Sequence, residues 1–227
     1  MSSKGISMKR LSFLIILGLI FTGCQNSSSN CPTTPYLFVT VQRVEQFYEA
    51  GSYEKQLEKI TLAAQQEAAV AIEDAVDGEK LAAVFDIDDT CISLYPIQKE
   101  INFGYLQEFY EQQEKAQILP ALKPTLRLYN YLKYRGVTIF FVTARSEFLK
   151  PYTIRNLKQV GYTGFERIYF FPTNKYQSIE AYKSAMRKMI TNQGYTIMMT
   201  VGDQESDLQG PDIGIPVKLP NHIYVIQ

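Results

Sequence analysis

Three aspartates lie within four residues, at Asp86, Asp88 and Asp89. They follow the apolar run Leu81–Phe85, which predicts a buried strand of a parallel sheet, because such strands are covered on both faces and do not alternate. Ligands of open α/β sheets bind beyond the carboxyl ends of the strands. Acids crowded there repel one another, so we expect a divalent cation such as Mg²⁺, which prefers oxygen ligands.

Two later apolar runs also predict strands that end in polar residues. The run Val137–Val142 leads into Thr143, and the run Thr196–Val201 opens into Asp203, with Asp207 four residues later. A turn or a helix cap is the plain alternative for any one of these ends, because Asp and Thr are common at both. Each such end means little by itself.

The residues at these ends resemble three motifs of the haloacid dehalogenase (HAD) superfamily. Asp86-Ile-Asp-Asp-Thr90 is similar to the first motif, Thr143 to the second, and Gly202-Asp203 followed by Asp207 to the fourth. The resemblance covers about residues 80–226. Further segments look like the acid-phosphatase branch, which includes bacterial class B and class C enzymes and plant vegetative storage proteins: Val84–Thr90, Tyr182–Ser184, Val201–Leu208 and Lys218–Asn221.

The resemblance implies a three-layer, Rossmann-like α/β fold with a parallel sheet in the order 3-2-1-4-5. It also implies N-terminal helices and a small helical cap insertion over about residues 92–120. Alternating strands and helices favour the same architecture, because parallel strands need right-handed crossovers. Besides the strands above, the patterns predict helices over 41–50, 52–76, 122–135, 148–160 and 178–192 and strands over 168–171 and 215–218, with 223–226 as a last edge piece. We expect Ser52 to cap its helix.

The resemblance also implies roles for the site residues. Asp86 would be the nucleophile, and Asp88 would protonate the leaving group and then activate water. Mg²⁺ would be held by Asp86, the backbone carbonyl of Asp88, Asp203 and Asp207. Asp89 has no implied chemistry and is either an exposed acid or a structural hydrogen-bond acceptor.

A second set of residues would bind the phosphate. The resemblance implies this role for Thr143, Ala144 and Lys183, with Lys175 as the competing lysine. Arg145 could approach the phosphate or form a salt bridge.

Aromatic residues are frequent in the predicted insertion. Tyr95, Phe103 and Tyr105 could stack on an aromatic leaving group, or they could belong to the core.

Composition argues against several other kinds of protein, although a net count does not exclude a single exposed basic face. Lys+Arg and Asp+Glu both number 23, so no basic excess indicates binding of a nucleic-acid polymer. The single histidine, His222, excludes mechanisms that need two histidines. Three cysteines are too few and too scattered for a zinc site of the usual spacing.

The N-terminus has the pattern of a secretory signal, in which basic residues precede the apolar run Leu11–Phe21. The residues up to Cys24 resemble a bacterial lipoprotein signal, which implies a signal peptide over 1–23, a lipidated Cys24 and a flexible tether over 24–35. An ordinary cleaved signal or an uncleaved anchor is the alternative. We expect an outer-membrane lipoprotein facing the periplasm or the cell surface, or otherwise a secreted periplasmic protein. Cys31 and Cys91 could pair or remain free thiols.

These observations predict, for residues 36–227, a single Mg²⁺-dependent acid phosphatase domain that hydrolyses small phosphomonoesters. Nucleoside monophosphates, sugar phosphates and aryl phosphates all fit as substrates. A catalytically weak binding lipoprotein and a phosphotransferase are the alternatives. The oligomeric state is open.

Overall fold

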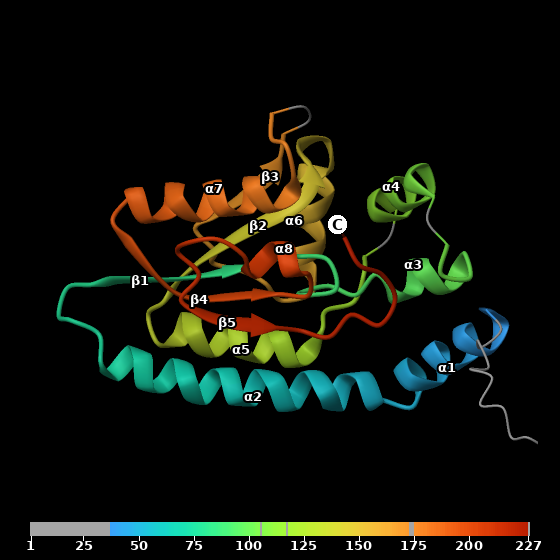
Figure 1. Ribbon diagram of the computed structural model, residues 1–227, viewed down its shortest axis with the longest axis horizontal. Helices are drawn as coiled ribbons and strands as arrows, with labels where there is room; N and C mark the ends of the chain where they lie inside the picture. Colours follow the sequence, from blue (N-terminus) through green and yellow to red (C-terminus); the bar gives the residue numbers. More distant parts are fainter. Residues whose placement is uncertain (1–36, 105, 117, 173–174, 227) are drawn as a thin grey trace, which may run out of the picture. The chain divides into compact units, whose positions relative to one another are not determined.

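A parallel five-stranded sheet in the order β3-β2-β1-β4-β5 forms the centre of the protein (Figure 1). The computed structural model describes residues 37–104, 106–116, 118–172 and 175–226. The strands are β1 (Lys80–Phe85), β2 (Thr138–Ser146), β3 (Arg167–Phe171), β4 (Tyr195–Gly202) and β5 (Ile215–Lys218). The predicted strand order is confirmed, and all four neighbouring pairs are parallel.

Helices cover both faces of the sheet, which gives the three predicted layers. Successive residues of β1 point to opposite faces. Ala83 and Phe85 pack in one core cluster, and Ala82 and Val84 pack in another. The first cluster is completed by α2 (Ser52–Glu73), α5 (Lys123–Tyr134) and α6 (Lys150–Gln159), and the second by α7 (Ile179–Asn192). In Figure 1, α7 lies on the opposite side of the sheet from α2 and α5.

The insertion between β1 and α5 contains two short helices, α3 (Tyr95–Glu100) and α4 (Gln107–Ala116). The insertion is therefore helical, as predicted, and it consists of two short helices rather than one. Asn102 and Phe103 separate the helices and have φ angles of 51° and 60°. The α-helix is right-handed, so it cannot continue through residues in this left-handed conformation.

Most helix boundaries lie within a few residues of those predicted. The first helix, α1, spans Leu37–Glu49, and the predicted helix over 148–160 begins as the 3₁₀ turn η1 (Glu147–Leu149) before α6. Ser52 does not cap α2, contrary to the prediction. Gly51, with a φ of 73°, precedes the helix, and Ser52 is already its first residue.

The predicted edge strand over 223–226 is also wrong, because side chains bind the amides that a strand would use. Asn221 Oδ1 accepts hydrogen bonds from the backbone N–H groups of Ile223 and Tyr224 at 2.9 and 3.1 Å. Gln204 Oε1 accepts one from Ile226 at 2.8 Å. This C-terminal segment therefore lies against the loop after β4 without joining the sheet.

The expected signal peptide, the tether, Cys24 and Cys31 lie outside the described residues. Cys91 is buried and is a free thiol. Within the part of the chain that the structure describes, no helix is long and apolar enough to cross a membrane.

Candidate active site

The register of the sheet brings the predicted strand ends together. β1 ends at Phe85, which pairs with Phe141 on β2 and with Val201 on β4. The next residue, Asp86, donates its backbone N–H to the Val201 carbonyl at 2.9 Å. Residues just beyond these pairs on β2 and β4 therefore flank Asp86 at the carboxyl edge of the sheet.

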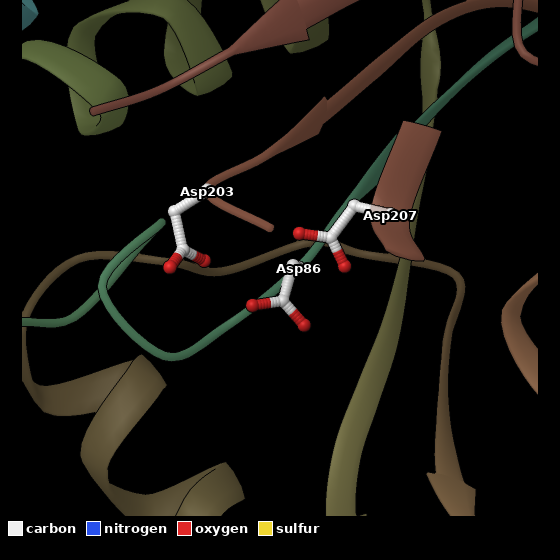
Figure 2. A group of neighbouring side chains, drawn as sticks. All are labelled: Asp86, Asp203 and Asp207. Atoms are coloured by element: carbon white, nitrogen blue, oxygen red, sulfur yellow. The ribbon is translucent and has the colours of Figure 1, made fainter. Parts of the chain in front are cut away.

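Three buried carboxylates meet there, from Asp86, Asp203 and Asp207. Each offers one oxygen, and these oxygens lie within 4.8 Å of one another. Figure 2 shows the three side chains pointing toward a common space. The buried Lys183 on α7 donates to Asp86 Oδ1 at 2.6 Å and also to Asp207 Oδ1. We refer to these three aspartates as the acidic triad.

Burial and repulsion together disfavour the charged forms of Asp86 and Asp203. Burial raises the pKa of Asp86 well above its usual range, and the charges of the other two aspartates raise it further against the attraction of Lys183. Burial, with the charge of Asp207, raises the pKa of Asp203 to about 6. Burial alone would lower the pKa of Lys183, but the charges of Asp86 and Asp207 raise it. Close, buried oxygen donors with excess negative charge fit a hard divalent cation.

Neighbouring polar groups fix the orientation of two triad members. Asp203 Oδ1 accepts from Thr90 Oγ1 at 3.0 Å, and its Oδ2 accepts from Gln204 Nε2 at 2.5 Å and Asn221 Nδ2 at 2.7 Å. Asp207 Oδ2 accepts from the Gln204 backbone N–H at 2.8 Å. Such partners orient ligands toward a metal and raise their affinity for it.

Gly202 lets Asp207 approach the end of β4. A Cβ atom at residue 202 would lie 2.3 Å from the Cβ of Asp207, which is far inside contact distance. Asp207 belongs to the short helix α8 (Glu205–Leu208), and the buried Arg187 binds its backbone carbonyl at 2.7 Å. Residue 202 must therefore be glycine because a side chain would not fit. Its backbone does not require glycine, since its φ angle is not positive.

Asp88 does not join the triad. Its carboxylate faces Arg145, whose Nε lies 2.9 Å from Oδ2 and whose Nη2 lies 2.6 Å from Oδ1. The Asp88 side chain is 22% exposed, while that of Arg145 is 3% exposed. The predicted contact of Asp88 with a metal runs through its backbone carbonyl, and this contact does not require the side chain, which faces Arg145.

The predicted phosphate-binding residues come from two elements. Thr143 is buried on β2, and its Oγ1 accepts the Arg145 backbone N–H at 3.1 Å, which still allows the hydroxyl to donate. Ala144 lines a cavity that also contains Asp88. Lys183 lies in the triad, whereas Lys175 is exposed and lies over the Tyr176 ring at 5.7 Å.

The cavity beside Asp88 has a volume of about 690 Å³. Its walls come from the cap, the ends of β2 and β3, the turn η1 and the C-terminal segment, including Leu94, Phe103, Leu149, Phe171 and Ile223. Of the aromatic residues singled out in the insertion, Phe103 lines this cavity. Tyr95 stacks instead on Tyr48 of α1 with ring centroids 4.6 Å apart, and Tyr105 lies outside the described residues.

Asp89 is a buried hydrogen-bond acceptor. Its Oδ1 accepts the Leu94 backbone N–H at 2.8 Å, and its Oδ2 accepts from Gln98 at 3.5 Å. Burial, with the charge of Asp203, raises the pKa of Asp89 to about 8. The residue has a left-handed backbone with a φ of 48°. Asp89 therefore links the strand end to the start of the cap.

This link predicts different effects for two substitutions of Asp89. Asp89→Ala is expected to lower the free energy of unfolding by about 1–3 kcal/mol, because the buried Leu94 amide loses its acceptor. Asp89→Asn keeps an oxygen acceptor and tolerates the left-handed backbone, so it should change stability by less than about 1 kcal/mol. Urea unfolding measures both, and equal losses in the two variants would contradict this role.

Three residues that contact the site were not singled out by their sequence pattern. Gln204 and Asn221 hold Asp203, and Glu114 on the cap contacts Arg145. Asn221 lay inside a segment that resembles the acid-phosphatase branch, but nothing distinguished it there. Glu114 belongs to a run rich in Gln and Glu, which predicts an exposed face, although it is buried.

Comparison with known families agrees with this geometry. The family model described as HAD superfamily, subfamily IIIB (Acid phosphatase) matches residues 28–227. This chain belongs to HAD subfamily IIIB. The resemblance predicted from the strand-end motifs is thereby confirmed.

Several plant proteins are similar to this subfamily IIIB chain. Vegetative storage protein 1 of Arabidopsis thaliana is 31% identical over 147 residues, which are 63% of this chain and 54% of that protein. Stem 28 kDa glycoprotein of Glycine max is 35% identical over 151 residues, which are 63% of this chain and 59% of that protein. Acid phosphatase 1 of Solanum lycopersicum is 30% identical over 149 residues, which are 63% of this chain and 58% of that protein. The chain thus spans little more than half the length of these relatives.

A solved structure shares the fold. The class C acid phosphatase from Bacillus anthracis, with tungstate bound, superposes with a TM-score of 0.68 at 21% sequence identity. The superposition covers 82% of this subfamily IIIB chain and 86% of that one.

Proposed function

We propose that this subfamily IIIB protein is a Mg²⁺-dependent acid phosphatase that hydrolyses small phosphomonoesters through an aspartyl-phosphate. The observation that carries the proposal is the buried acidic triad at the carboxyl edge of the sheet, with Lys183 bound to Asp86 at 2.6 Å. Charged groups held at a fixed edge in a water-poor site are what phosphoryl transfer requires.

In the proposed reaction, Asp86 attacks phosphorus and forms an acyl phosphate while the bond to the leaving oxygen breaks. Asp88 gives its proton to that oxygen, then accepts one from the water that cleaves the aspartyl-phosphate. Lys183, the Thr143 hydroxyl and the backbone at Ala144 hold the phosphoryl oxygens. When bound by Asp86, Asp203, Asp207 and the Asp88 carbonyl, Mg²⁺ would offset the repulsion between the nucleophile and the phosphate.

The cavity beside Asp88 supports leaving groups with an apolar face. Its volume of about 690 Å³ suits a group of nucleoside or aryl size, and Phe103 lies in its wall. We therefore propose nucleoside monophosphates and aryl phosphates ahead of sugar phosphates. We also propose that the N-terminal segment is a lipoprotein signal and that lipidated Cys24 holds the protein at the outer membrane.

A binding role without turnover is the second candidate, because relatives that are 31% and 28% identical are vegetative storage proteins. The complete triad and Lys183 favour the enzyme. Transfer of phosphate to an alcohol, the third candidate, would appear as a new phosphomonoester when an alcohol is added to the assay.

Removal of divalent metal tests the proposal. The purified protein is expected to hydrolyse p-nitrophenyl phosphate with Mg²⁺ at acid to neutral pH. Chelation with EDTA is expected to lower the rate by at least about 100-fold, because the triad would then lack its balancing charge. Added Mg²⁺ should restore the rate. Failure to turn over this ester and a panel of other monoesters with Mg²⁺ would favour the binding role.

A further inference from the structure

Arg145 contacts two carboxylates from different parts of the fold. Its guanidinium binds Asp88 through Nε and Nη2, and Nη2 also lies 3.1 Å from Glu114 Oε1. Its Nη1 donates to Thr153 Oγ1 on α6 at 3.1 Å. Arg145 is therefore the link between the residue proposed to move protons and α4 of the cap.

Both side chains of the ion pair between Arg145 and Glu114 are buried. The side chains of Arg145 and Glu114 are 3% and 8% exposed. A buried charge is costly unless it is paired, so the ion pair with Arg145 stabilises the Glu114 carboxylate. The planar fork of Arg145 fixes the directions of its donors, and its Nη2 is shared between Asp88 Oδ1 and Glu114 Oε1.

We propose that Glu114 is a positioning residue that acts through Arg145 on Asp88, so that the cap sets the orientation of the proton donor. The inference rests on the proposed function, because it needs Asp88 to act on the leaving oxygen. Without the Glu114 charge, Nη2 would belong to Asp88 alone, and Arg145 would hold the Asp88 carboxyl group more tightly and away from that oxygen. The loss should be largest for leaving groups that need a proton most.

Two esters of similar size distinguish this effect from a general loss of activity. p-Nitrophenyl phosphate leaves as a weakly basic phenolate, whereas 2-phenylethyl phosphate leaves as a strongly basic alkoxide that requires protonation. In the full-chain protein with Mg²⁺, Glu114→Gln is expected to lower kcat/KM roughly 10- to 100-fold for the alkyl ester, as for other residues that orient a catalytic group. We expect a change of less than about 3-fold for the aryl ester, since it scarcely needs the acid.

The same helix offers a matched control. Glu111 lines the same cavity one turn earlier and pairs with Lys115 at 3.9 Å. Glu111→Gln removes the same charge from the same wall without touching Arg145, so the ratio of the two kcat/KM values should equal that of the wild type. Glu114→Asp keeps the charge and should recover part of the alkyl-ester activity.

Each outcome either supports or overturns the inference. A selective loss in Glu114→Gln that is absent in Glu111→Gln supports it. Equal losses for both esters, or no change in a variant that unfolds at the wild-type urea midpoint, overturn it. Should Glu114→Gln fail to fold, Glu114→Asp decides, because it keeps the charge but shortens the side chain that reaches Arg145 and must show the same selectivity to a smaller extent. A wild-type protein that hydrolyses neither ester overturns the proposed function and this inference together.

Discussion

Asp86→Asn is expected to lower kcat for phosphomonoester hydrolysis by about 10⁴-fold or more, while the protein remains folded. The amide has the size of the carboxylate but cannot attack phosphorus. Its oxygen can still accept the Lys183 hydrogen bond that Asp86 Oδ1 accepts now. Steady-state rates with p-nitrophenyl phosphate measure the loss, and mass spectrometry after acid quenching should detect the phosphorylated protein in the wild type alone.

Asp89→Asn is the matched control for this experiment. It makes the same chemical change three residues away, at an acid that holds the cap and contacts Leu94 and Gln98. We expect it to retain near wild-type turnover. If Asp86→Asn were as active as Asp89→Asn, another residue would have to be the nucleophile.

Lys183→Met is expected to reduce both activity and stability. The buried ammonium contacts Asp86 and Asp207, so removing it leaves their charges without that partner. Breaking a buried pair in this way costs about 3–5 kcal/mol in the free energy of unfolding. Excess Mg²⁺ should recover part of this loss, because an ion that binds the folded state stabilises it by mass action. Urea unfolding with EDTA and with Mg²⁺ measures both effects.

Lys175→Met serves as the control, because Lys175 is the competing candidate for the phosphate-binding lysine. It is exposed, and its substitution should change stability by less than about 0.5 kcal/mol. Comparable losses of activity in the two variants would contradict the assignment of Lys183 to the phosphate. A Lys183→Met protein as stable as the wild type in EDTA would contradict the electrostatic account of the triad.

The part of the site that follows strand ends could be predicted from the sequence. Asp86, Thr143 and Asp203 each follow or end an apolar run, and parallel strands place such residues at one edge. The sheet order came from the resemblance carried by these same residues. Asp207 lies four residues after Asp203, close enough for the short helix α8 to return it to the edge.

The residues that orient the site had no such local signal. Glu114 contacts Arg145 because the cap packs against β2 and α6. The spacing of apolar residues in the sequence does not predict that contact. The segment over 223–226 has the composition of a strand, yet Asn221 and Gln204 bind its amides. Propensity describes what the backbone prefers, and side chains distant in sequence can override it.

The position of β1 in the sheet has a consequence for synthesis of the chain. The strand lies between β2 and β4, and 97 residues separate Asp86 from Lys183. At about 5–20 residues per second, a ribosome needs roughly 5–20 s to make that interval. During this time β1 has no partner on its β4 side, and the acids at its end lack their lysine. We therefore expect the sheet to close late and slowly, as pairings distant in sequence require, so that production at lower temperature or with chaperones should raise the soluble yield.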